Sequence, residues 1–77
     1  MVRFINKFGM EFLVYSVFIE VDFTDLDGDG SDCIRYCVQG LCPGANTVPE
    51  VHTLAVYKKL DAAIKLAKQI RVCLEVE

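Results

Sequence analysis

The chain has 77 residues and a net charge of −3, and hydrophobic residues make up 53% of it. This length suits a single domain with a modest core, and so apolar a composition excludes an intrinsically disordered chain. Because a domain this small cannot hide all of its apolar side chains, the composition also predicts that the protein binds a protein partner or forms a homo-oligomer.

The apolar segments are too short to cross a membrane as a helix. A spanning helix needs about 20 consecutive apolar residues, whereas the longest apolar stretch, residues 12–19, is interrupted by Ser16. Arg3 and Lys7 lie near the start, but no small-residue cleavage site of a signal peptide follows them. We therefore expect a cytoplasmic protein with no membrane partner.

Acidic and basic residues are segregated along the chain. Residues 8–34 contain no Lys or Arg and hold seven carboxylates, whereas five basic residues follow in the C-terminal part. The basic residues are Lys58, Lys59, Lys65, Lys68 and Arg71. An acidic half repels phosphates, so we expect no nucleic-acid partner. The basic residues are typical of the solvated face of a helix.

Hydrophobic alternation predicts two strands before the acidic segment at residues 24–32. Residues 2–8 form a short strand, and Gly9 permits a turn after it. Residues 10–23 form one long strand, in which the odd positions from Leu13 to Phe23 share an apolar face. The opposite face is apolar in its first half only. We expect the interaction surface on that face, at Phe12, Val14 and Phe18.

The second half of the chain predicts two more strands and a helix. Residues 33–38 form the returning strand of a hairpin, residues 40–49 form a loop rich in turn residues, and residues 51–57 form another strand. A helix follows, because apolar residues recur at spacings of three and four. These are Leu60, Ala63, Ile64, Ala67 and Ile70. Residues 72–77 alternate again and predict a last strand, and a continued helix that places Leu74 near Ile70 is the alternative.

This order of elements predicts an α+β fold. We expect residues 1–77 to form a single α+β domain, with a small antiparallel sheet of four or five strands packed on one C-terminal amphipathic helix. Residues 53–67 resemble the strand-to-helix step of small β-β-β-α proteins such as HicB-type antitoxins. That resemblance covers fifteen residues. It implies that the small side chains of Ala63 and Ala67 pack a helix against a sheet, and it implies no function.

The loop after the long strand is a candidate cation site. Asp25, Asp27 and Asp29 alternate and are followed by Gly30, as in the opening of an EF-hand calcium loop. The match then fails, because Tyr36 stands where the bidentate Glu belongs and strands flank the loop. We predict either a different calcium site, with Asp25, Asp27, Asp29 and Asp32 as ligands, or a solvated hairpin tip.

Four cysteines suggest a second kind of chemistry. Cys33, Cys37, Cys42 and Cys73 lack the CxxC knuckle of most structural zinc sites, although His52 could add a ligand. Four cysteines are many for a reduced cytosolic protein of this length. Disulfides between Cys37 and Cys42 and between Cys33 and Cys73 are therefore one alternative, and four free thiols are the other.

The sequence carries no catalytic signature. It has one His, and it has no GxSxG, HExxH or phosphate-loop motif. We expect no enzyme and no cofactor, with Ca²⁺ as the alternative. The favoured function is a non-catalytic module that binds a protein partner or itself, in the manner of a small acidic phage-type inhibitor of a host machine. A cation-binding protein and a thiol or zinc module are the alternatives.

Overall fold

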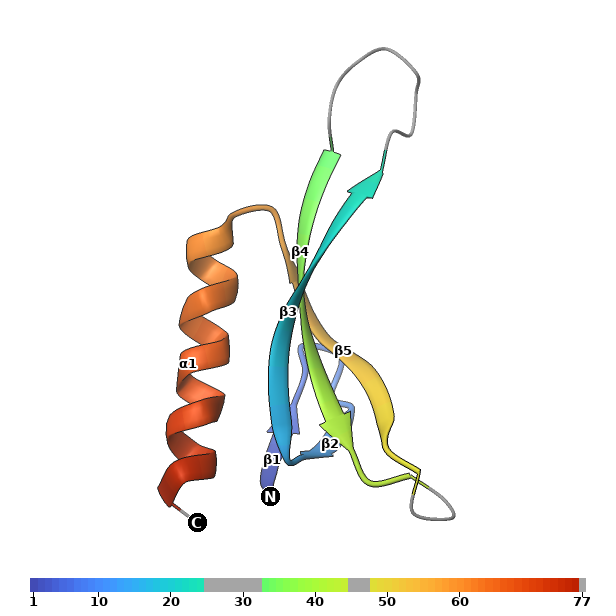
Figure 1. Ribbon diagram of the computed structural model, residues 1–77, viewed down its shortest axis with the longest axis vertical. Helices are drawn as coiled ribbons and strands as arrows, with labels where there is room; N and C mark the ends of the chain where they lie inside the picture. The colour runs from blue at the N-terminus through green and yellow to red at the C-terminus, as the bar shows by residue number, and fades with distance from the viewer. Residues whose placement is uncertain (25–32, 45–47, 77) are drawn as a thin grey trace.

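The computed structural model describes residues 1–24, 33–44 and 48–76, which form five strands followed by one helix. The strands are β1 (Val2–Ile5), β2 (Glu11–Val14), β3 (Ser16–Thr24), β4 (Cys33–Cys42) and β5 (Glu50–Tyr57), and the helix is α1 (Leu60–Val76). β1 pairs with β2, while β3, β4 and β5 form a second antiparallel sheet in that order. Figure 1 shows α1 beside this larger sheet and the β1–β2 hairpin near one end of it. The predicted α+β fold is confirmed, with the strands divided between two sheets.

The long strand predicted over residues 10–23 is wrong, because the chain bends at Tyr15 and joins the two sheets there. The Tyr15 N–H donates to the Leu41 carbonyl at 2.9 Å, which ties the bend to β4. Val14 before the bend and Val17 after it are both buried, three positions apart, so the alternation of faces restarts. Leu13 and Tyr15, predicted on the inner face, are therefore exposed.

The turn between β1 and β2 is built around Asn6. Its side-chain oxygen accepts hydrogen bonds from the backbone N–H groups of Phe8 and Met10, each at 2.9 Å. The Gly9 N–H donates to the Asn6 carbonyl at 3.0 Å, and Gly9 has a φ of 81° that side-chain-bearing residues rarely adopt. Residues 6–10 therefore hold one compact conformation that carries Lys7 and Phe8 at its tip.

The central strand β4 is longer than predicted and continues through residues 39–42. Its core face is formed by Val38, Gly40 and Cys42, which are all buried. Val38 pairs with Ala55 but Gln39 pairs with Thr53, so Leu54 is the extra residue of a β-bulge in β5. Leu54 is buried in the core as a result.

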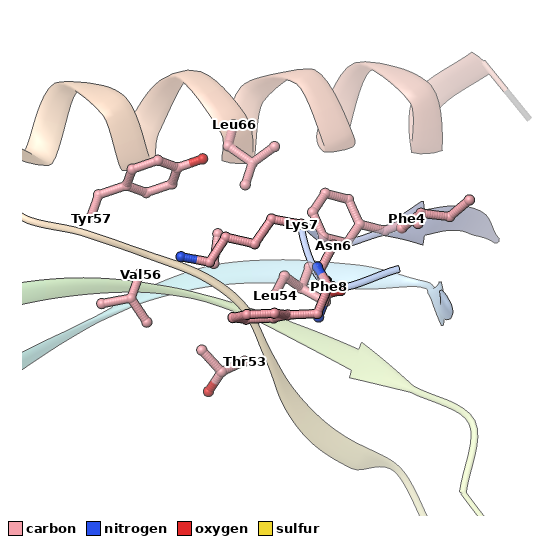
Figure 2. Close-up of a pocket in the computed structure, with 11 residues that line it drawn as sticks. Phe4, Asn6, Lys7, Phe8, Thr53, Leu54, Val56, Tyr57 and Leu66 are labelled. Carbon is pink, nitrogen blue, oxygen red and sulfur yellow. Dashed lines mark hydrogen bonds between the residues drawn. The ribbon is translucent and has the colours of Figure 1, made fainter. Parts of the chain in front are cut away.

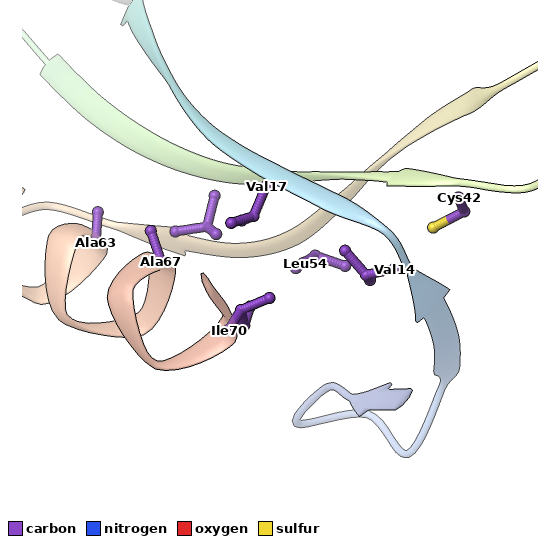
Figure 3. Packing of buried hydrophobic residues seen from close by; sticks show 8 residues of the cluster. Val14, Val17, Cys42, Leu54, Ala63, Ala67 and Ile70 are labelled. Carbon is purple, nitrogen blue, oxygen red and sulfur yellow. The ribbon is translucent and has the colours of Figure 1, made fainter. Parts of the chain in front are cut away.

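Small residues let α1 approach the sheet closely. Figure 3 shows Ala63, Ala67 and Ile70 directed toward Val17 and Leu54 of the sheet, and all five are buried. The helix contacts β3, β4, β5 and β1. It continues to Val76, so the strand predicted over residues 72–77 is wrong; Leu74 packs against the core instead. Within the described residues, no helix is both long and apolar enough to span a membrane.

Candidate functional site

An uncovered apolar surface lies where β3 and β4 extend beyond the rest of the fold. β5 pairs with β4 only as far as the Tyr36–Tyr57 pair, whereas β3 and β4 remain paired to Thr24 and Cys33. Figure 1 shows these two strand ends projecting past the first turn of α1. A two-stranded ribbon has no third strand and no helix to bury its apolar side.

That apolar side consists of Val21, Phe23, Ile34 and Tyr36, which we call the arm face. Val21 pairs with Tyr36 and Phe23 with Ile34, so the four side chains lie on one side of the ribbon. Phe23 is 70% exposed. On the opposite side, Arg35 donates to the Asp22 carboxylate at 3.3 Å. The ribbon is thus apolar on one side and polar on the other.

A second feature is a groove of about 380 Å³ between β5 and the β1 end of the smaller sheet. One wall is residues 53–57 of β5, the other is residues 4–8, and Leu66 of α1 also lines it. Side chains of a strand alternate between its two faces. Five consecutive residues therefore line a groove only when it runs along the edge of the strand, and β5 is an edge strand.

Among the described residues that line this groove, Lys7 is the only charged one. Its ammonium lies 5.2 Å from the centroid of the Phe8 ring, in a cation–π contact. No ion pair joins Lys7 to any residue that the structure describes. Figure 2 shows the Lys7 side chain running along the groove between Leu66 on one side and Leu54 on the other.

Polar residues link the three strands on the face turned away from the helix. The Gln39 amide donates to Glu20 at 3.1 Å and accepts from the Thr53 hydroxyl at 2.9 Å. Gln39 is 7% exposed, and every buried side-chain nitrogen or oxygen atom in the described residues has a hydrogen-bond partner. Because the buried polar atoms of these groups have hydrogen-bond partners, this network joins the three strands of the sheet.

Cys42, Glu50 and His52 come together at the far end of the larger sheet. Cys42 pairs with Glu50, whose carboxylate lies 3.0 Å from His52 Nε2. The His52 ring packs on Phe12, with the ring centroids 5.3 Å apart. Burial first, and the negative charge of Glu50 second, raise the pKa of the Cys42 thiol above its usual value. A raised pKa disfavours the thiolate, so this cluster does not provide an activated nucleophile.

The structure places the predicted cysteines apart. Cys37, Cys42 and Cys73 are free thiols. The predicted Cys37–Cys42 disulfide is wrong because both residues lie on β4, about 16 Å apart at 3.3 Å per residue. The predicted Cys33–Cys73 disulfide is wrong because Cys73 is a free thiol exposed on α1. The side chain of Cys33 lies outside the described part of the chain.

The remaining predicted site residues divide into three cases. Asp25, Asp27, Asp29 and Asp32 all lie outside the described residues, so the cation site stays a prediction. Val14 is 0% exposed because the bend at Tyr15 turns it inward, so it belongs to the core and not to a contact surface. Phe12 is half-buried against the core and His52, while Phe18 is exposed on the outer face of the larger sheet.

No cluster of three or more His, Cys, Asp or Glu residues suited to a metal lies within residues 1–24, 33–44 and 48–76.

Sequence reasoning missed both surfaces described above. The sequence predicts paired strands over residues 10–23 and 33–38, but no pattern in it shows that β5 pairs only as far as Tyr36 and leaves the rest of the arm face uncovered. The groove joins residues that are more than forty positions apart, and no sequence pattern indicates that approach. The chain matches no protein-family model, no curated protein and no solved structure.

Proposed function

We propose that this protein is a small non-catalytic module that binds a protein partner or a second copy of itself through the arm face. The observation that supports this most directly is the exposure of Phe23 and Val21 on the side of the ribbon that continues the buried face of the sheet. A contiguous apolar patch on a projecting pair of strands is the kind of surface that protein interfaces bury.

The energetic reason is the burial of aromatic and branched side chains. Fully burying a side chain such as Phe contributes about 1.5–3 kcal/mol. Phe23 is 70% exposed, so most of that contribution is still available to an interface. Tyr36 and Ile34, on the neighbouring strand, are half-buried, and Ile34 is the cross-strand partner of Phe23. Aromatic residues are typical anchors of protein interfaces.

The experiment compares the full chain with Phe23→Asp. Light scattering after size-exclusion chromatography, over a range of concentrations, measures self-association. Affinity capture with quantitative mass spectrometry, using these two proteins and a control variant as baits, measures partner binding. Val76→Asp is the matched control, because Val76 is also an exposed hydrophobic residue but lies at the end of α1.

We expect the original chain and Val76→Asp to share a dimer or a captured protein that Phe23→Asp lacks. Circular dichroism spectra of the three proteins should agree, because both substituted side chains are exposed. The proposal is wrong if the original chain is a monomer at every concentration and the three baits capture the same proteins.

A further inference from the structure

The groove between β5 and residues 4–8 has the form of a receptor for an extended chain. β5 has β4 on one side only, so its other edge presents backbone N–H and C=O groups that no strand in the described structure pairs with. β1 likewise has β2 on one side only. An added strand beside β5 would pair its backbone with that edge, as in recognition by β-strand addition.

The shape of the groove selects a single chain over the edge of a folded sheet. Residues 4–8 form the wall opposite β5, held in place by the hydrogen bonds of Asn6. The edge strand of a second folded molecule brings its own neighbouring strands, about 4.8 Å further out, and those would meet this wall. A lone extended segment brings none.

The chemistry of the groove selects the side chains of that segment. Phe4, Leu54 and Leu66 provide apolar contacts, and Tyr57 lies at one end of the groove. Lys7 adds one positive charge that no described carboxylate neutralises. A carboxylate in this position would gain an ion pair beside apolar surface, where screening by water is weaker than in bulk solvent.

We propose that this groove binds an extended peptide segment of a protein partner, by strand addition to β5, and that the segment carries an Asp or Glu between apolar residues for Lys7. The inference rests on the proposed binding function but uses a different surface, so it can fail while the arm face still binds. Ile5 and Phe8, which also line the groove, are exposed and add apolar contact area for the segment.

The test selects peptides and then maps where they bind. A phage-displayed library of random dodecapeptides is selected against the full chain, and the enriched peptides are synthesised with a fluorescent label. Fluorescence anisotropy measures their affinity for the original chain, Lys7→Gln, Lys7→Glu and the control Lys68→Glu. Lys68 is exposed on α1 and does not line the groove. Amide chemical shifts of the ¹⁵N-labelled chain locate the bound peptide.

We expect enriched peptides with an acidic residue flanked by apolar residues at alternate positions. Lys7→Gln should weaken binding about threefold and Lys7→Glu about tenfold, while Lys68→Glu stays within about twofold, because exposed ion pairs are modest and charge reversal adds repulsion. Replacing the acidic residue of the peptide by its amide should weaken binding to the original chain and leave binding to Lys7→Gln unchanged. The largest amide shifts should fall in residues 53–57 and 4–8.

Backbone pairing has its own readout, which is a peptide with N-methyl groups at alternate residues. It should lose at least tenfold in affinity, because strand addition needs those N–H groups. The inference is overturned if no peptide is enriched, if the N-methylated peptide binds as well as its parent, or if the shifts map to the arm face. It is also overturned if residues 53–57 shift with protein concentration alone, which would assign the groove to a second copy. In each case the Phe23→Asp comparison still decides the proposed function separately.

Discussion

The substitution Gly40→Ala should destabilise the fold, because Gly40 of β4 lies directly against the side chains of Leu54 in β5 and Val14 in β2. A methyl group added there would sit 2.9 Å from Leu54 Cδ1, 3.2 Å from Leu54 Cγ and 3.2 Å from Val14 Cγ1. Leu54 is 3% exposed and Val14 0% exposed, so neither side chain can swing out into solvent. The extra methyl group must displace packed neighbours.

Overpacking of this kind costs about 1–3 kcal/mol. Removing the flexibility of glycine from the unfolded chain recovers about 0.4–1 kcal/mol. The net loss in the free energy of unfolding is then about 1–2 kcal/mol. For 77 residues the entropy of unfolding is about 0.16 kcal/mol per kelvin, so the melting temperature should fall by roughly 6–12 °C.

Thermal unfolding followed by circular dichroism measures this change, and a double substitution checks its cause. Leu54→Ala alone should cost about 2–5 kcal/mol, because it leaves a cavity. In that background Gly40→Ala should cost little or even stabilise, since the two nearest atoms are gone and the methyl group fills part of the cavity. Equal losses in both backgrounds, or no loss in the original chain, would refute the packing argument.

Three further predictions concern the thiols and the acidic loop. Because the pKa of Cys42 is raised on folding, the unfolded chain releases this proton first. Stability should therefore be fully present below pH 9.0 and fall above it, and Cys42→Ser should flatten that fall in pH-dependent melting curves. Alkylation by iodoacetamide under native conditions, followed by mass spectrometry, should modify exposed Cys73 before buried Cys42, and a faster Cys42 would contradict its burial. If Asp25, Asp27, Asp29 and Asp32 bind Ca²⁺, adding Ca²⁺ at 100 times the Kd to protein freed of metal by a chelator should raise the free energy of unfolding by about 2.7 kcal/mol. An unchanged melting temperature at millimolar Ca²⁺ would reject the site.

The helix was predictable because its signal is local. The spacing of Leu60, Ala63, Ala67 and Ile70 requires a period near 3.6, and three of these residues are buried as that period demands. The end of the helix was not predictable. Alternation at residues 72–77 suits a strand as well as a helix, no Gly or Pro follows Ile70, and the packing of Leu74 against the core decides the outcome.

The bend at Tyr15 and the groove depend on contacts distant in sequence. Every odd position from Leu13 to Phe23 is apolar, so the sequence contains no sign that the buried face of the strand changes sides at Tyr15. The change accompanies the hydrogen bond from the Tyr15 N–H to the Leu41 carbonyl, which only the assembled sheet creates. Lys7 reads as an ordinary surface lysine until the turn brings it beside β5.

Each strand in this molecule pairs with the strand next to it along the chain: β1 with β2, β3 with β4, and β4 with β5. Hairpins of this kind close short loops and lose little chain entropy before their hydrogen bonds form. We therefore expect the strands to assemble quickly, and α1 to dock across β3 and β1 only after the folding transition state. Substitutions at Ala67 should then accelerate unfolding more than they slow refolding.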